Sequence, residues 1–151
     1  MARANSVPAL AGAVIFSAAL AFSPVVSAQD KQRQDLALTI TLNGSPYAAT
    51  LDDTPPARDF ASLLPLDLVL RDYHGIEKVA DLPRDLDTSG APASYEPRAG
   101  DITVFAPWGN IAIFYKPFRA SPGLVRLGAF EQMPEALGGA GDLTVRIERA
   151  R

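Results

Sequence analysis

After residue 35, hydrophobic residues recur at every second position or in short continuous runs, separated by Gly, Pro, Asn and Asp. A period of two is typical of β-strands, and the separating residues are typical of turns. The pattern predicts eight strands, at residues 36–42, 47–51, 66–73, 76–79, 102–105, 111–115, 124–129 and 143–148.

One segment has the period of a helix instead. Asp53 or Thr54 can cap its start, and the two prolines that follow suit the first helical turn. Phe60, Leu63 and Leu64 then fall on one helical face. We expect a short helix here, placed over one end of the strand assembly.

The strands at the two ends of the predicted domain alternate most cleanly, and each can pair with the other. Pairing them would close the sheet and remove the exposed edges that invite aggregation. The pattern therefore predicts a mainly β protein, a closed eight-stranded barrel with one clear short helix.

The stretch from Ile102 to Tyr115 is predicted to be the central hairpin, with Pro107, Trp108, Gly109 and Asn110 at its turn. Its arms are nearly uncharged, which favours burial of both faces, one by a core and the other by a loop or a ligand. Trp108 is the only tryptophan, and it lies where a connection is normally polar. It either lines a shallow pocket or folds back to cover the end of the barrel.

The first 28 residues have the features of a secretory signal: Arg3, an apolar run, and Val26, Ser27 and Ala28 as a cleavage site. An uncleaved membrane anchor over residues 7–26 is the alternative. The predicted organisation is a signal at 1–28, a flexible lead at 29–35 and the barrel at 36–151, in a periplasmic or secreted protein.

Composition narrows the possible partners. Without the signal the chain has 13 basic and 17 acidic residues, a net charge of −4, so nothing in its charge favours nucleic acid or an anionic membrane surface. It has no cysteine, which excludes disulfides and thiol chemistry. We predict no cofactor.

Residues 81–100 show no period and contain three prolines, which predicts a long loop of the kind that often covers a binding site. Its oxygen-bearing side chains match a calcium-loop spacing at Asp85, Asp87, Ser89, Gly90 and Glu96. No helix flanks the match, and such residues are ordinary turn chemistry, so we predict no metal site.

A hydrolase would need a serine beside the only histidine, His74. Ser62, Ser94 and Ser121 are the candidates, but none lies in a nucleophile motif.

Several motifs together resemble the bacterial cyclophilin-like domain family. They are Leu-Asn-Gly (42–44), Pro-x-Ala-Arg-x-Phe (55–60), Leu-Leu-Pro-Leu (63–66), Leu-Asp-Thr-x-Gly-Ala-Pro (86–92), Ala-Gly-Asp-Ile (99–102), Pro-Trp-Gly-Asn-Ile-Ala-Ile-Phe-Tyr (107–115) and Pro-Gly-Leu-Val-Arg-Leu-Gly (122–128). The resemblance implies the small eight-stranded cyclophilin barrel. Prolyl isomerases of this architecture use an arginine in an Arg-Phe-Gln pattern. Residues 76–84 lack that pattern, and Arg84 is the remaining candidate.

We therefore expect an exported module that binds a peptide or a small ligand. The predicted cleft is walled by Phe105, Trp108 and Tyr115 and overhung by the loop at 84–95. The predicted ligand-binding residues are Phe105, Trp108, Asn110, Tyr115 and Tyr95. Two alternatives stay open: a prolyl isomerase, in which Arg84 would hydrogen-bond the prolyl nitrogen, and a purely structural domain.

Overall fold

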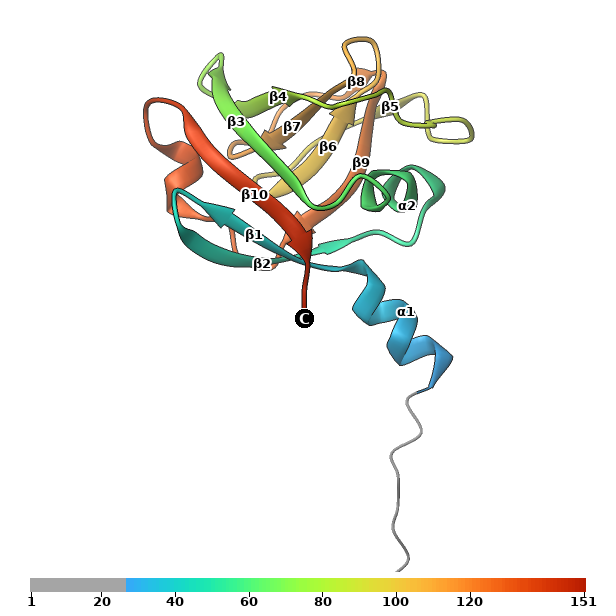
Figure 1. Ribbon diagram of the computed structural model, residues 1–151. Helices are drawn as coiled ribbons and strands as arrows, with labels where there is room; N and C mark the ends of the chain where they lie inside the picture. Colours follow the sequence, from blue (N-terminus) through green and yellow to red (C-terminus); the bar gives the residue numbers. More distant parts are fainter. Residues whose placement is uncertain (1–26) are drawn as a thin grey trace, which may run out of the picture.

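Eight antiparallel strands form a closed barrel in the computed structural model, which describes residues 27–151 (Figure 1). The order around the barrel is β1-β10-β3-β4-β7-β6-β9-β2. The strands are β1 (Ala37–Leu42), β2 (Ser45–Leu51), β3 (Leu66–Tyr73), β4 (Glu77–Asp81), β6 (Asp101–Phe105), β7 (Asn110–Phe114), β9 (Leu124–Phe130) and β10 (Leu143–Arg149). The predicted fold class is confirmed.

The two ends of the domain close the barrel, as the sequence predicts. β1 pairs with β10, placing Ile40 opposite Ile147, and on its other edge β1 pairs with β2. The turn between β1 and β2 has positive φ at both Asn43 (45°) and Gly44 (88°), the geometry that an Asn-Gly hairpin turn requires.

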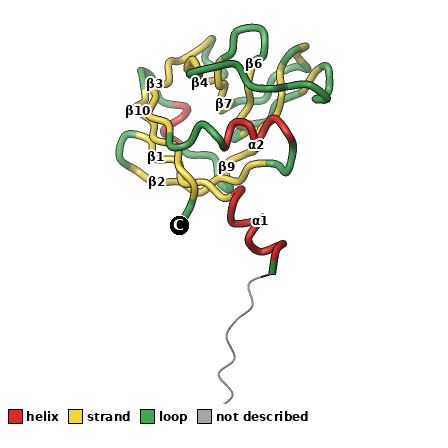
Figure 2. The backbone as a smooth tube through the Cα atoms, turned by 45° about the vertical axis from the view of Figure 1, so that its right-hand side comes forward, coloured by secondary structure: helices red, strands yellow, loops and turns green. Residues whose placement is uncertain are grey.

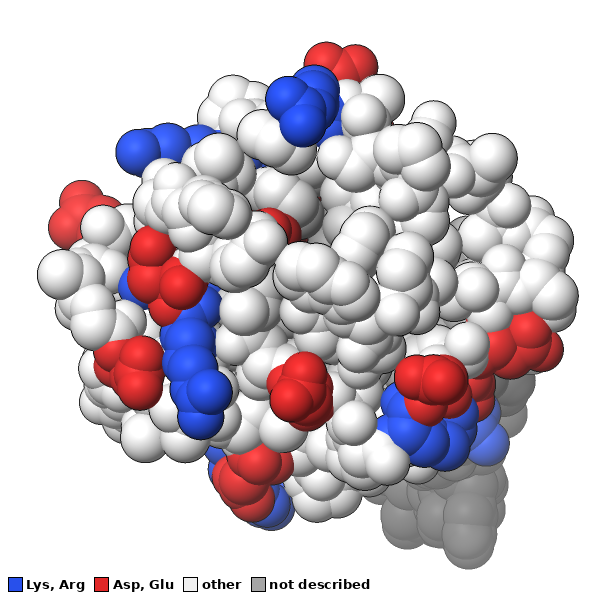
Figure 3. Space-filling model, turned by 90° about the horizontal axis from the view of Figure 1, so that it is seen from above, with Lys and Arg blue, Asp and Glu red and all other residues white. Residues whose placement is uncertain are grey.

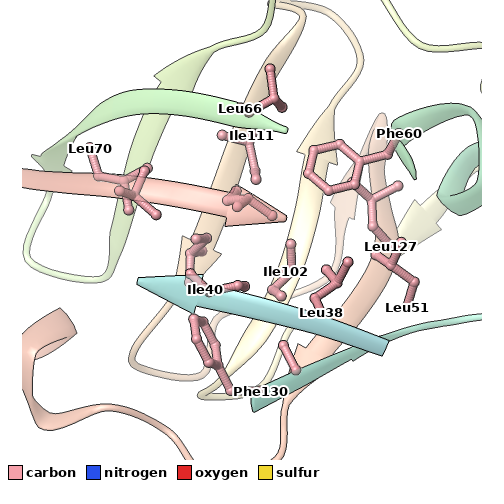
Figure 4. Close-up of a cluster of buried hydrophobic side chains, with 14 of the residues drawn as sticks. Leu38, Ile40, Leu51, Phe60, Leu66, Leu70, Ile102, Ile111, Leu127 and Phe130 are labelled. Carbon is pink, nitrogen blue, oxygen red and sulfur yellow. The ribbon is translucent and has the colours of Figure 1, made fainter. Parts of the chain in front are cut away.

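The barrel interior is filled by the apolar residues that the alternation selects. Figure 4 shows Leu38, Ile40, Ile102, Ile111 and Leu127 converging on it from four strands, β1, β6, β7 and β9. Helix α2 (Pro55–Ala61) covers one end of the barrel and inserts Phe60, which is 0% exposed. The hydroxyl oxygen of Thr54 caps this helix by accepting from the backbone N–H of Ala57 at 3.4 Å. The predicted short helix is thus confirmed. A 3-10 helix, η1 (Glu135–Gly138), adds buried Leu137.

One charged side chain lies inside the barrel. Lys78 on β4 is 0% exposed, and its ammonium donates to the carbonyls of Gly139 at 2.8 Å and Gly141 at 3.0 Å. It also lies 3.2 Å from the carboxylate of Asp72 on β3. These contacts tie the segment that follows η1 to the barrel wall.

The lead to the barrel is helical in this structure. The expected flexible segment at 29–35 lies within a helix, α1 (Ala28–Leu36), which projects from the barrel (Figure 2). The hydroxyl oxygen of Ser27 accepts from the backbone N–H of Asp30 at 3.2 Å, and no Gly or Pro interrupts the segment. The predicted signal segment, apart from Ser27 and Ala28, lies outside the described residues. No helix within residues 27–151 is long and apolar enough to cross a membrane.

Two very short strands also lie outside the barrel. β5 (Ser94–Tyr95) and β8 (Ser121–Pro122) pair antiparallel with each other. They join the two predicted loops, 81–100 and 116–123, into one layer, in which β5 packs against β9.

Candidate functional site

A pocket of about 270 Å³ lies on the outer surface of the barrel, across strands β4, β7, β6 and β9. Side chains on β7 alternate, so Ile111 and Ile113 enter the core while Asn110, Ala112 and Phe114 face outward. Ala112 and Phe114 are nonetheless buried, because loop residues cover this part of the barrel surface. The pocket is lined by Tyr73, Glu77, Val79, Phe105, Trp108, Asn110, Ala112, Phe114, Phe118, Ser121, Pro122 and Leu124.

The loop after β7 forms one wall of the pocket. The backbone N–H of Phe118 donates to the carbonyl of Pro97 at 3.2 Å, and that of Gly123 donates to Ala93 at 3.0 Å. Gly123 has a φ of 79°, and a Cβ at this position would lie 2.8 Å from the Pro107 ring. Glycine is therefore required where this wall meets the turn of the central hairpin.

Trp108 stands at the rim of the pocket and is 60% exposed. Its ring meets the ring of Phe105 edge to face at 5.2 Å and that of Tyr73 at 5.8 Å, with interplanar angles of 85° and 84°. The backbone N–H of Trp108 donates to the Phe105 carbonyl at 3.1 Å, which fixes the turn. The indole thus connects β3 with β6 across the mouth of the pocket.

Asn110 places an unpaired acceptor beside this cavity. The residue is 6% exposed, and its Oδ1 has no hydrogen-bond partner among the described residues. A buried acceptor without a partner costs about 1–3 kcal/mol. Oδ1 exposes less than 1 Å² in this structure, so a ligand that donates to it would recover that free energy only after the amide turns toward the cavity.

Glu77 is the only charged residue among those that line the pocket. It lies on β4, opposite Tyr73 on one side and Phe114 on the other. Burial raises the pKa of the Glu77 carboxyl to about 7. The pocket therefore holds a carboxyl group that changes its charge near neutral pH. Viewed from above the barrel, the surface is largely uncharged in the middle, with most charged side chains around it (Figure 3).

The structure brings together three of the predicted ligand-binding residues, Phe105, Trp108 and Asn110. Tyr115 instead lies inside the barrel, where its hydroxyl donates to the Asp72 carboxylate at 2.6 Å. Burial, together with that bond, raises the pKa of Tyr115 to about 12. Tyr95, on β5 in the covering layer, packs against the buried cluster of Ala112, Phe114 and Leu124, and its hydroxyl donates to the carboxylate of Asp101 at 2.6 Å. Neither tyrosine lines the pocket.

Arg84, the predicted catalytic arginine, does not line the pocket and is paired with Asp59 of α2. Its guanidinium donates to both carboxylate oxygens of Asp59, at 2.9 and 2.7 Å, and to the hydroxyl of Ser62 at 2.9 Å. The hydrogen bond from the Arg84 guanidinium is the main reason why the pKa of Asp59 is lowered to about 2. The loop at 84–95, expected to overhang the cleft, lies against α2 through this pair, while the loop at 118–122 walls the pocket.

The other sequence candidates form no reactive cluster. Asp87 accepts from the backbone N–H of Ser89 at 3.0 Å, as in an ordinary turn. Within residues 27–151, no three His, Cys, Asp or Glu side chains are placed to hold a metal ion. His74 lies in the β3–β4 turn at a φ of 53°, with its ring against Tyr73 at 4.2 Å. The hydroxyls of Ser62 and Ser121 donate to the backbone carbonyls of Asp59 and Arg119.

Sequence reasoning missed Tyr73, Glu77 and Phe118 as pocket residues. Tyr73 and Glu77 belong to different predicted strands and meet only through the pairing of β3 with β4. The alternation does carry one usable signal for Glu77. Residues 77 and 79 lie on the same face of β4, so the sequence places the Glu77 carboxyl next to an apolar residue, Val79, at the centre of that face.

Comparison with known proteins gives a matching family and a related fold. A model described as the cyclophilin-like family matches residues 40–148. The chain is similar to the solution structure of a hypothetical protein from Archaeoglobus fulgidus, with a TM-score of 0.54 and 20% identity, covering 76% of this chain and 95% of that one. At this identity the similarity concerns the fold alone. No curated protein matches the chain.

Proposed function

The chain belongs to the cyclophilin-like family, and from that premise we propose that it is an exported binding module that holds a small ligand or a short peptide segment beside Trp108. The observation that carries the proposal is the buried, unpaired Oδ1 of Asn110 in the wall of a pocket of about 270 Å³. Apolar walls with a few placed polar groups are the usual construction of a small-molecule site.

The size of the pocket limits the ligand. Ligand pockets commonly measure about 300–1,000 Å³, so this cavity, at about 270 Å³, suits a small molecule or one or two side chains of a peptide. The aromatic rings would contact its apolar part, and Asn110 would accept a hydrogen bond from an N–H or O–H of the ligand.

Binding is favoured over isomerisation by the lining residues. Polarising a prolyl amide needs a hydrogen-bond donor placed against the prolyl nitrogen. No arginine is among the residues that line the pocket, and the guanidinium of Arg84 is bound by Asp59. The geometry thus supports retention of a ligand without a catalytic donor.

Trp108 provides the test, because it is the only tryptophan and stands at the pocket rim. We expect members of a fragment library to change its fluorescence with saturation. Ala112→Phe should abolish the response by filling the pocket floor, and Asn110→Leu should weaken it by removing the acceptor. Val69→Thr, at an exposed site on β3 outside this pocket, should leave it unchanged. A library that leaves the emission unmoved, or that acts equally on wild type and Ala112→Phe, would favour a structural domain.

Export is a separate part of the proposal, supported by the signal-like pattern of residues 1–28. Expression of the full chain in a Gram-negative host should yield a periplasmic product whose amino terminus is Gln29. A product that keeps residue 1 and sediments with membranes would instead support an uncleaved anchor over residues 7–26.

A further inference from the structure

We propose that the ligand of this pocket is a small organic cation of the alkylammonium class, held between aromatic ring faces and the Glu77 carboxylate. This inference rests on the proposed binding function and names the chemistry of its ligand. Two independent features of the lining carry it, the number and arrangement of its rings and the sign of its charge.

Five of the twelve lining residues are aromatic. They are Tyr73, Phe105, Trp108, Phe114 and Phe118. Trp108 stands nearly perpendicular to both Tyr73 and Phe105, at 84° and 85°, so these rings form corners and do not stack. Corners of aromatic rings surround quaternary ammonium groups in proteins, because each ring face carries partial negative charge. A neutral apolar ligand does not need this arrangement.

The charge of the lining also favours a cationic ligand. Glu77 is its only charged residue, and no lysine or arginine lines the pocket. An ionised carboxylate in apolar surroundings is unfavourable unless a counter-charge accompanies it. Lys78 does not supply that charge, since its side chain lies on the opposite face of β4, inside the barrel. A bound cation would do so, whereas an anionic ligand would be repelled.

The other charged or titratable groups on neighbouring elements lie outside the lining. They are Asp67, Arg71 and Asp72 on β3, His74 in the β3–β4 turn, Lys78 and Asp81 on β4, Asp101 on β6, Arg126 on β9, and Lys116 and Arg119 in the loop after β7. The guanidinium carbon of Arg119 lies over the Phe118 ring, 5.0 Å from its centre. Among these groups, His74 contacts the ring of the lining residue Tyr73. It therefore needs its own control.

Cation binding should depend on pH with a definite sign. The pKa of Glu77 is raised to about 7, so the empty pocket carries the carboxylate above that pH and the neutral acid below it. A permanent cation favours the ionised form. Its affinity should rise by up to about tenfold between pH 6 and pH 8, as the ionised fraction grows.

A matched pair of probes isolates the charge. Choline and 3,3-dimethylbutan-1-ol have nearly the same shape, but only choline is a cation. At pH 8 we expect choline to bind at least tenfold more tightly in a calorimetric or NMR titration. Glu77→Gln should remove the pH dependence and reduce this preference to the part that the ring faces contribute. His74→Asn, which tolerates the positive φ of the turn, should retain both.

The results separate this inference from the proposed function. Equal affinity for the two probes, no choline binding up to 20 mM, or an undiminished preference in Glu77→Gln would overturn the cation proposal. If the neutral alcohol binds as well as choline and Ala112→Phe abolishes both, the binding function stands without it. N-acetyl-trimethyllysine amide, tested beside choline, shows whether a free molecule or a peptide side chain is the better source of the head group.

Discussion

Replacing Asn110 with leucine should make the protein more stable. Asn110 is buried on the outer face of β7, where it pairs with Phe105 of β6 and Asp81 of β4. Its Oδ1 has no partner among the described residues, so folding removes this acceptor from water without replacing the lost hydrogen bond. Leucine has nearly the same shape and no such acceptor.

The size of the effect follows from the desolvation of one amide oxygen. An unsatisfied buried polar group costs about 1–3 kcal/mol, and part of the gain is lost with the amide nitrogen and through imperfect packing of leucine. We expect a net stabilisation of about 1–2 kcal/mol, or roughly 3–8 °C in Tm for a domain of this size.

Urea unfolding of wild type and Asn110→Leu, followed by Trp108 fluorescence and circular dichroism, measures this difference. Thr103→Val is the matched control, because Thr103 is 0% exposed and its hydroxyl donates to the carbonyl of Ala112 at 2.7 Å. That substitution removes a satisfied group and should destabilise by about 1 kcal/mol. If Asn110→Leu is destabilised as much as Thr103→Val, Asn110 has a partner in the folded protein and the reasoning about the pocket fails.

Three further changes test other parts of the structure. Lys78→Met should destabilise by about 2–4 kcal/mol in urea, because it removes charge-assisted bonds to two carbonyls; a loss below about 0.5 kcal/mol would mean that they contribute nothing net. The folded pKa of Glu77, about 7, lies above its unfolded value of 4.5, so stability should fall as pH rises between them. Glu77→Gln should remove this fall in stability, which we expect to be about 1–2 kcal/mol after allowing for solvent screening. If the stabilities of the two proteins depend on pH in the same way, the carboxyl is not buried. Gly128→Ala should lower the free energy of unfolding by more than about 3 kcal/mol, because the new Cβ would lie 2.2 Å from the backbone oxygen of Thr50. Gly138→Ala is the control in the same urea unfolding experiment and should change little, because the nearest atom to its Cβ would be 3.9 Å away.

The barrel was predictable because it is recorded locally in the sequence. Each strand carries its own alternation, and the two end strands are matched in length and pattern, so closure follows from the need to cover sheet edges. β5 and β8 were not predictable in this way, since two residues are too few to show a period.

The site was predictable only where it is local. Phe105, Trp108 and Asn110 share one hairpin, so they must lie near one another. Tyr115 shows how the same pattern can be misapplied. It has the parity of Ile111 and Ile113, which face the core, whereas Asn110 has the opposite parity. Glu77 and Tyr73 join the site through pairing between strands, which hydrophobic periodicity does not specify in advance.

The most direct test of the account is a protein-observed NMR screen with a library of small alkylammonium and neutral apolar compounds. The single indole N–H signal of Trp108 and the side-chain amide signals of Asn110 report on the rim and the wall of one pocket. We predict that at least one compound shifts both with the same saturating concentration dependence, and that Ala112→Phe abolishes the shifts. Shifts that never saturate, or that map to residues away from the outer face of β7, would contradict a ligand site beside Trp108.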